Sequence, residues 1–262
     1  MSESVDCRIA VVTGAAKGIG KSIAQTLAED GYTVIATSRN FEHAHLGEVS
    51  SRRIHELKLD PAFPDSFKKL ADFIEARYGR LNLLVNNVGG IEKYGTWEEL
   101  DLNDWNLAFQ RNVVFTVSAV KGLEELLFKT DCSSILNIGS LTSKEPGQYN
   151  PHYSSSKAAL SNLTKYLATR FADKGVRVNE VLAGPIFTHS WENMLNSNEE
   201  LPPNIRSLRM QELVEEAEKA IPLGRVGKGE DIANIVKFLS GPEATWITGT
   251  SVVIDGGKSK SY

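Results

Sequence analysis

Tyr153 and Lys157 are the two residues of this sequence whose types and spacing point most directly to chemistry. They are four residues apart at the start of a stretch with helical character, about one helical turn, so both side chains project from one face. A lone serine, Ser140, ends a strand-like run thirteen residues upstream. A nearby ammonium group favours the ionised form of a phenol, whose pKa is otherwise near ~10. The pair therefore predicts a proton donor for a carbonyl, with the pKa of Tyr153 lowered by Lys157.

A glycine-rich loop near the start of the chain predicts a phosphate-binding site. The run Gly14-Ala15-Ala16-Lys17-Gly18-Ile19-Gly20 follows a strand-like segment and leads into a helical pattern. Glycine lets the backbone turn tightly and approach a pyrophosphate, and the start of a helix offers free N–H groups and the positive end of its dipole. The strand before the loop and the helix after it supply the context that such a site requires.

The elements that must position these residues alternate along the chain, which is typical of an α/β fold. Strand-like runs cover residues 9–13, 33–37, 53–57, 81–86, 134–138, 176–181 and 251–254. Most of them, the last included, are nearly continuous apolar runs, which indicates parallel strands covered on both faces. Helical patterns cover 19–28, 67–78, 105–128, 158–171 and 232–239, with stops at Gly31 and Gly79. We expect a doubly wound, seven-stranded parallel sheet with helices on both faces, in one domain spanning 1–262.

Composition and charge exclude several classes of function. The chain has 262 residues, 41% hydrophobic and 24% charged, with a net charge of −4, which argues against nucleic acid or an anionic membrane as the main partner. We expect neither a membrane span nor a signal peptide, because no apolar run is long enough. The widely spaced Cys7 and Cys132 are typical of reduced thiols in a cytoplasmic protein. His43 and His45 have no third ligand nearby, so no metal site is expected.

Residues 187–224 form a long connection without a strand signal. A connection of that length in a compact domain indicates a substrate lid or an inserted pair of helices, and we expect a helix at 208–220. An ordinary surface insertion is the alternative. His189, at the root of this segment, is a candidate substrate contact, whereas His152 is expected to be structural.

Together the motifs resemble those of the short-chain dehydrogenase/reductase superfamily, in its standard branch. The matching segments, which cover the chain in the family's order, are Thr13 to Gly20, Asn86-Asn87-Val88-Gly89, Asn112, Ser140, Tyr153-x-x-x-Lys157, Gly184-Pro185-Ile186-x-Thr188 and Asp255-Gly256-Gly257. The resemblance implies a Rossmann fold and an oxidoreductase. The motifs resemble those of 3-oxoacyl-carrier-protein reductases in a general way and not closely.

The resemblance also implies a role for each catalytic candidate. Tyr153 is the general acid when a carbonyl is reduced, and Lys157 lowers its pKa and binds the nicotinamide ribose. Ser140 holds the substrate oxygen and stabilises its developing charge. Asn112 binds a water that links Lys157 to solvent.

The end of the second strand predicts the cofactor. An acidic residue near Ser38 is expected where the adenosine ribose carries a free 2′-hydroxyl, and Ser38-Arg39-Asn40 contains none. Arg39, together with Lys17 from the glycine loop, suits a 2′-phosphate. The sequence therefore predicts NADP(H).

Further cofactor contacts are carried over from the family. The resemblance assigns them to Gly14, Ala16, Lys17, Gly18, Ile19, Gly20, Asp60, Asn87, Val88, Gly89, Gly184, Pro185, Ile186 and Thr188, besides Ser38, Arg39, Asn40, Tyr153 and Lys157. Asp60 is the expected acceptor for the adenine amino group. Pro61 has no N–H, which removes a backbone bond that the family makes to adenine.

The substrate is expected to be a small molecule bound between the nicotinamide and the lid. Leu141, Tyr149, Phe187, Trp191 and Met194 predict a mostly apolar pocket, which favours a ketone on an apolar skeleton or a thioester-linked 3-oxoacyl group. Oxidation of a secondary alcohol and a noncatalytic NADP(H)-sensing protein are the alternatives. Family members form homotetramers or homodimers, and the segments 102–128 and 153–173 would supply the interface.

Overall fold

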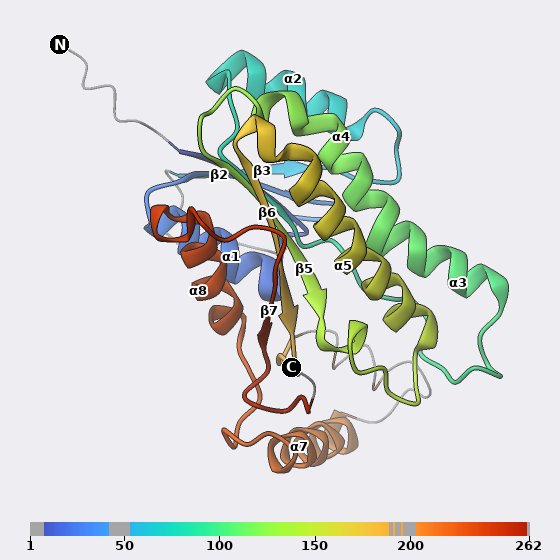
Figure 1. The fold of residues 1–262 in the computed structure, drawn as a ribbon. Helices are drawn as coiled ribbons and strands as arrows, with labels where there is room; N and C mark the ends of the chain where they lie inside the picture. The colour runs from blue at the N-terminus through green and yellow to red at the C-terminus, as the bar shows by residue number, and fades with distance from the viewer. Residues whose placement is uncertain (1–7, 42–52, 189–190, 192–194, 196–202, 261–262) are drawn as a thin grey trace.

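A computed structural model of the chain describes residues 8–41, 53–188, 191, 195 and 203–260. Within them a parallel sheet has seven strands in the order β3-β2-β1-β4-β5-β6-β7 (Figure 1). The order reverses between β1 and β4, so the sheet is doubly wound and the crevice at the carboxyl ends of these strands is the expected ligand site. The predicted fold class is confirmed.

The strands and helices follow the predicted alternation. The strands are β1 (Ile9–Thr13), β2 (Thr33–Ser38), β3 (Ile54–Lys58), β4 (Leu83–Asn86), β5 (Ser133–Ser140), β6 (Val176–Ala183) and β7 (Ser251–Ile254). The α-helices are α1 (Gly18–Glu29), α2 (Ser66–Tyr78), α3 (Leu102–Phe109), α4 (Phe115–Leu127), α5 (Pro151–Phe171), α7 (Pro203–Lys219) and α8 (Gly229–Ser240). Short helical turns are η1 (Gln110–Val114), η2 (Leu141–Ser143), η3 (Ala172–Lys174) and η4 (Pro242–Ala244).

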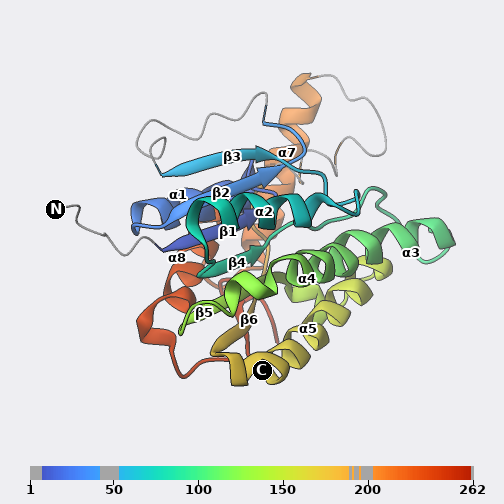
Figure 2. The same cartoon turned by 90° about the horizontal axis from the view of Figure 1, so that it is seen from above.

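Two hydrophobic layers hold helices to opposite faces of the sheet. On one face α1 and α8 pack through Ile23, Leu27 and Val236 against apolar side chains of the strands. On the other face α2, α4 and α5 contribute residues such as Ile74 and Leu123 (Figure 2). Because both faces are covered, β1, β5 and β6 are buried along their whole length. The continuous apolar runs of the first and fifth strands predict this, whereas β6 is buried although it carries polar and charged residues.

Several predicted elements differ from the structure. Helix α5 begins at Pro151, seven residues before the predicted start at 158, and β4 begins at Leu83, two residues after the predicted start at 81. The helix expected over 105–128 is divided, because the π-helix η1 separates α3 from α4. The third strand begins one residue later than expected, at Ile54. Strand β7 is half-buried along its length, because it forms the edge of the sheet beside β6 only. Its apolar residues therefore do not mark a strand that is covered on both faces within this chain.

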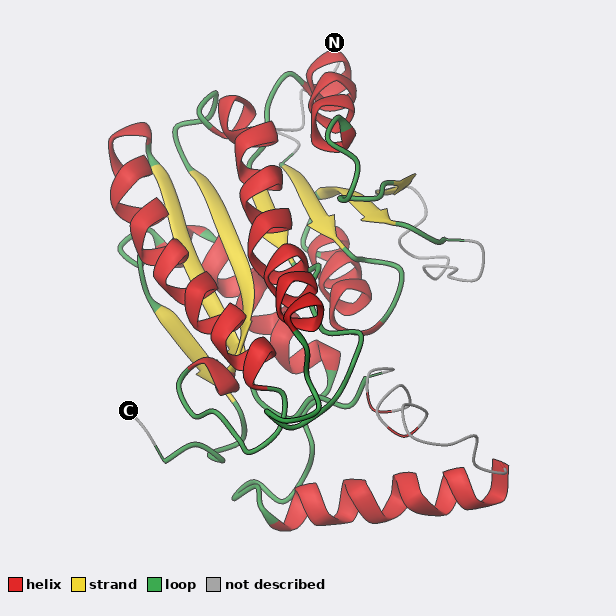
Figure 3. Cartoon of the chain, turned by 90° about the vertical axis from the view of Figure 1, so that its right-hand side faces the viewer, coloured by secondary structure: helices red, strands yellow, loops and turns green. Residues whose placement is uncertain are grey.

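Helix α7 lies beyond the carboxyl ends of the strands, apart from the layered body (Figure 3). It begins five residues before the predicted start at 208 and ends one residue before 220. The lid candidates His189 and Met194 lie outside the described residues, as do Cys7, His43 and His45. None of the described helices combines the length and the apolar character that a bilayer-spanning helix needs.

Candidate active site

The loop between β1 and α1 is shaped by its glycines and by one asparagine. Gly14 and Gly18 have φ angles of +66° and +55°, a region that favours glycine. A Cβ at Gly20 would collide with Gly14 O and with the side chain of Asn87. Asn87 Nδ2 donates to Thr13 O at 2.9 Å and to Gly14 O at 3.1 Å. The loop is thereby fixed against the end of β4, with the N-terminus of α1 behind it.

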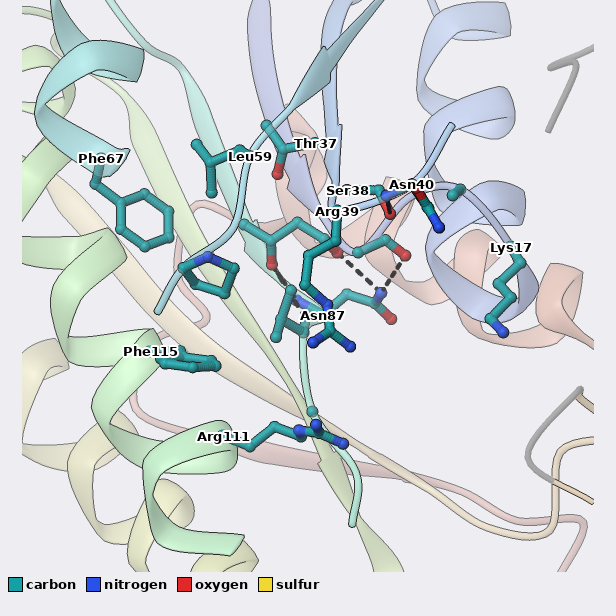
Figure 4. A pocket seen from close by; sticks show the side chains of 16 residues that line it. Lys17, Thr37, Ser38, Arg39, Asn40, Leu59, Phe67, Asn87, Arg111 and Phe115 are labelled. Atoms are coloured by element: carbon teal, nitrogen blue, oxygen red, sulfur yellow. Dashed lines mark hydrogen bonds between the residues drawn. The ribbon is translucent and has the colours of Figure 1, made fainter. Parts of the chain in front are cut away.

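A cavity of about 580 Å³ opens beside this loop, at the carboxyl ends of β1, β2 and β4. Figure 4 shows that Phe67 and Phe115 lie at one side of it and Lys17 at the other, with Arg39 between them. Thr37, Ser38 and Asn40 line the same wall, and none of the described lining residues is acidic. The cavity thus combines an apolar end, which suits a flat ring, with a cationic end, which suits phosphate.

Asp60 lies beside the first cavity, in the turn between β3 and α2. Pro61 lines the cavity and Asp60 is not among the described lining residues. Asp60 Oδ1 accepts a hydrogen bond from Ala62 N at 3.0 Å, and Asp60 O accepts one from Ser66 Oγ at 2.5 Å. The aspartate therefore stabilises the turn that leads into α2.

A second cavity, of about 570 Å³, continues from the first and contains Ser140, Tyr153 and Lys157. Lys17, Arg39, Asn87, Gly89 and Arg111 line both cavities. Every predicted cofactor-binding residue except Asp60 therefore lies on one of the two walls. A continuous cavity with cations at one end and a hydroxyl–phenol–amine group at the other fits a dinucleotide whose reactive ring lies at the second end.

Strand β5 and helix α5 bring the catalytic candidates together. Ser140 is the last residue of β5, and its Oγ lies 3.0 Å from Thr142 Oγ1. Tyr153 and Lys157 lie one turn apart on α5, with Lys157 Nζ 5.7 Å from the centroid of the Tyr153 ring. Lys157 Nζ donates to Ile138 O at 2.7 Å, which ties α5 to β5 beneath the site.

Burial dominates the ionisation of this pair. It raises the pKa of Tyr153 to about 12; a hydrogen bond with Ser140 opposes this rise, and the Tyr94 phenol adds to it. Burial also lowers the pKa of Lys157 to about 8, with the charge of Glu180 opposing the change. The structure thus differs from the expectation that Lys157 lowers the pKa of Tyr153. The loss of water around the phenol is the main cause of the raised pKa, and the Lys157 ammonium group is directed to Ile138 O.

Asn112 is fully buried within the π-helix η1 and does not line either cavity. Its Oδ1 accepts from Gly90 N at 2.9 Å, and its Nδ2 donates to Gly90 O at 2.9 Å and to Ala108 O at 2.8 Å. A Cβ at Gly89 would lie 2.9 Å from Asn112 Oδ1 and 3.1 Å from Lys157 Nζ. Asn112 therefore fixes the Gly89–Gly90 backbone against Lys157, and glycine at 89 permits that approach.

The segment after β6 closes the second cavity. Gly184, Pro185, Ile186 and Thr188 line it, and a Cβ at Gly184 would collide with Asp255. Phe187 N donates to Gly227 O at 2.8 Å and Gly227 N donates to Pro185 O at 2.9 Å. These bonds hold the segment as a short extended strip facing the glycine loop.

The substrate side is more polar than the sequence predicts. Tyr149 and Trp191 line the second cavity as expected, but Leu141 is buried in the core and Phe187 packs on Trp191 outside the lining. The polar residues Tyr94, Thr142 and Asn150 complete the described wall and lie in the segments 90–97 and 141–150, where substrate-selecting residues are expected; Ser154 lies outside them. Arg111, also not selected, lines both cavities and pairs with Glu92. In the sequence, the feature that could have identified Arg111 as a site residue is its position next to Asn112.

His152 is buried, as its predicted structural role requires. Its ring lies 6.2 Å from that of Trp105, which in turn makes an edge contact with Trp97. Burial lowers its pKa, which keeps the ring neutral. The described residues hold no group of three His, Cys, Asp or Glu side chains placed to bind a metal ion.

Comparison with known proteins places these motifs in a family. A family model described as Enoyl-(Acyl carrier protein) reductase matches residues 14–259. The chain is 31% identical over 266 residues to the 3-oxoacyl-acyl-carrier-protein reductase FabG of Thermotoga maritima, across 95% of this chain and 97% of that relative. The chain belongs to the short-chain dehydrogenase/reductase superfamily. It is therefore an oxidoreductase of a family that uses a nicotinamide cofactor.

Other members show how widely this fold is used. The chain is 29% identical over 260 residues to the cyclohexanol dehydrogenase of an Acinetobacter strain, across 98% of this chain and 96% of that relative. The crystal structure of YwfH, described as an NADPH-dependent reductase, aligns with a TM-score of 0.86 and 28% identity over 98% of this chain and all of that one. The family thus fixes the reaction class, and the substrate depends on the residues around the second cavity.

Proposed function

We propose that this protein is an NADP(H)-dependent oxidoreductase that reduces a ketone or a 3-oxoacyl-type carbonyl to a secondary alcohol. The observation that carries the cofactor choice is the wall at the end of β2, where Arg39 and Lys17 line the first cavity without an acidic neighbour among the described residues. Arginine binds phosphate through its planar guanidinium group. A carboxylate at this position would accept a hydrogen bond from a free ribose 2′-hydroxyl, so its absence favours a cofactor with a 2′-phosphate.

The chain's own residues account for the proton side of the reaction. A bound reduced nicotinamide supplies the hydride. The hydroxyls of Ser140 and Tyr153 donate to the carbonyl oxygen as charge develops on it, and the Tyr153 proton is transferred. Lys157, anchored to Ile138 O, places its charge below the phenol and stabilises the phenolate that remains. Asn112 holds the Gly89–Gly90 backbone that borders Lys157.

The substrate proposal follows from the described wall of the second cavity. Tyr94, Tyr149 and Trp191 offer broad apolar faces, and Thr142 and Asn150 offer hydrogen bonds. Such a wall suits a small ketone with an apolar skeleton and one or two polar groups, either free or thioester-linked.

Oxidation of a secondary alcohol is the second candidate, because the same residues act in both directions. The cyclohexanol dehydrogenase among the relatives supports it. The high pKa of Tyr153 favours reduction, since a phenol that holds its proton is an acid and not a base at neutral pH. A noncatalytic NADP(H)-sensing role is the third, and the presence of both Tyr153 and Lys157 argues against it.

Steady-state kinetics with both cofactors tests the proposal. We expect consumption of NADPH with members of a panel of ketones and 3-oxoacyl thioesters, and a lower KM for NADPH than for NADH. Arg39→Ala should raise the KM for NADPH by about tenfold or more, since a hydrogen bond to a charged group contributes about 1.5–3 kcal/mol, and should leave NADH use unchanged.

The control for that substitution is Arg53→Ala, since Arg53 donates to Gly31 O away from the cavity. Equal or better use of NADH by the wild-type protein would contradict the cofactor choice. Tight binding of NADPH without turnover of any carbonyl or alcohol would favour the sensing role.

A further inference from the structure

Glu180 is a fully buried carboxylate in the interior of the sheet, and the reaction described above does not use it. It lies in the middle of β6, in register with Asn137 of β5 and Ser251 of β7. Charged side chains are rarely buried unless they are paired, because removing a carboxylate from water costs several kcal/mol. A neutral residue would fill this position at lower cost, so the carboxylate calls for a functional explanation.

The surroundings of Glu180 are built to receive its side chain. A Cβ at Gly139 would collide with the Glu180 carboxylate, so the glycine of β5 leaves the space that the carboxylate occupies. Ser251 Oγ donates to Glu180 Oε2 at 2.8 Å. Among the described residues no donor reaches Oε1. Ser161 faces the carboxylate from α5, but its hydroxyl donates to Lys157 O at 3.2 Å.

The charged groups that face this carboxylate are two lysines. Lys144 follows η2 and is exposed, so solvent screens its charge. Lys157 is 3% exposed and reaches the same region from α5, where it donates to Ile138 O beside Gly139. No described ion pair joins Glu180 to Lys157. Burial raises the pKa of the Glu180 carboxyl, whereas hydrogen bonds with Ser161 and Ser251 and the charges of Lys157 and Lys144 oppose that rise. Lys157 Nζ also lies 5.7 Å from the centroid of the Tyr153 ring, so the ammonium group interacts with the carboxylate and lies close to the phenol.

We propose that Glu180 is a positioning residue that holds Lys157 in its charged form, so that the ammonium group can stabilise the Tyr153 phenolate in the proposed reaction. Burial works against that charged form and lowers the pKa of Lys157 to about 8, whereas the charge of Glu180 raises it. Without the carboxylate, Lys157 would lose its proton nearer to neutral pH. The lysine would then offer the tyrosine no positive charge.

The direct test is the pKa of Lys157, measured by NMR titration of its labelled Cε in the protein without added cofactor. Lys157→Met identifies the resonance. An opposite charge nearby typically shifts a pKa by one to three units, so Glu180→Gln should lower the Lys157 pKa by about one unit or more. Glu180→Asp, which keeps the charge, should restore part of the loss. An unchanged Lys157 pKa in Glu180→Gln would overturn the proposal.

Val181→Ala is the matched control, because Val181 is the next residue of β6 and packs on the opposite face with α1 and α8. It creates a cavity in the same strand without altering the charge near Lys157. We expect it to lower the melting temperature and to leave the Lys157 pKa unchanged. A shift equal to that of Glu180→Gln would mean that any disturbance of β6 suffices, which would also overturn the proposal.

Activity gives an independent readout that rests on the proposed function. In Glu180→Gln the fall of kcat/KM for reduction at high pH should begin about one pH unit earlier, with little change at the optimum. Absence of turnover by the wild-type protein would refute the proposed function alone, since the NMR titration needs no substrate. Normal turnover with an unshifted profile would refute the role of Glu180 alone.

A measurement on the wild-type protein covers the case in which Glu180→Gln does not fold. The labelled Cδ of Glu180 should report an ionised carboxylate at pH 7, and its shift should change again as Lys157 loses its proton. A neutral carboxylic acid at pH 7 would overturn the proposal without any substitution.

Discussion

The Tyr153 phenol, with its pKa raised to about 12 by burial, retains its proton throughout the physiological range. It is suited to donating that proton at the moment when charge appears on a substrate oxygen. Ser140 contributes the second donor, and its contact with Thr142 keeps the hydroxyl at the end of β5. At the scale of single residues, this arrangement supports the proposed reduction of a carbonyl.

Replacing the tyrosine separates chemistry from binding. In Tyr153→Phe we expect kcat to fall by at least about 10²-fold, the contribution of a general acid, while the Kd for NADPH stays unchanged because the aromatic ring remains. Tyr166→Phe is the control, since Tyr166 lies exposed on the same helix. Steady-state kinetics and fluorescence titration with NADPH measure both quantities. A kcat close to that of the wild type would refute the assignment of Tyr153.

Single residues were predictable where their signal is local. The one-turn spacing of Tyr153 and Lys157 and the glycine spacing at 14–20 can be read within a few positions of the sequence. Arg111 enters the site only through the packing of distant segments, and no local pattern distinguishes it from a surface residue. The raised pKa of Tyr153 was missed for a related reason, because burial depends on the whole surrounding fold.

At the scale of elements, the π-helix η1 is the feature that aligns α3 and α4 with the site. It widens one turn between α3 and α4 and places Asn112 in the interior, against Gly90. Such widened turns are frequent at functional sites. The sequence gives little sign of it, because apolar side chains continue at helical spacing from Trp105 through the division. The long helix was therefore a reasonable but wrong prediction.

The close approach at Gly89 yields a test of this alignment. In Gly89→Ala the new methyl group must displace Asn112 or Lys157, because its Cβ would lie within 3.1 Å of each. We expect kcat to fall by about tenfold or more, since a displacement of about 1 Å at an active site is costly. Gly147→Ala is the control, because a Cβ there meets no atom within 4 Å. Equal kinetics for the two variants would contradict the role given to the Gly89 approach.

At the scale of the whole molecule, the sequence predicted a parallel sheet but not which strands lie at its edges. Continuous apolar runs indicated a parallel sheet, and the helices on both faces follow from burying it. The run at β7 has the same character, yet the strand lies at an edge and is half-buried, because a sequence does not specify which strand has one neighbour. The lid, likewise, was predicted as a segment over 187–224, and α7 is the long helix among its described residues.

The burial of Lys157 makes the stability of the fold depend on pH. Its pKa is about 8 in the folded chain against 10.5 when free. Between these values the unfolded chain binds a proton that the folded chain lacks, so stability rises with pH across that window, by up to roughly 3 kcal/mol in all. Above about pH 10 the raised pKa of Tyr153 acts in the opposite direction, because only the unfolded chain then loses the phenol proton.

Urea unfolding of the wild type and of Lys157→Met from pH 7 to pH 10 measures this dependence. The difference in unfolding free energy between the two proteins should move in favour of the wild type as the pH rises above 8. Titrations that the two proteins share cancel in this difference. A difference in unfolding free energy that stays constant over the whole range would show that folding does not lower the pKa of Lys157.

The space that Gly139 leaves for the Glu180 carboxylate has an evolutionary consequence. A side chain added at 139 would collide with the Glu180 carboxylate and also with Leu182 Cδ2, so such a mutation requires a smaller residue at 180 and a shift of the Leu182 side chain. The two positions are therefore expected to vary together among relatives. A lineage that has lost the glutamate and gained a side chain at 139 cannot easily regain the glutamate, because its carboxylate would collide with that side chain.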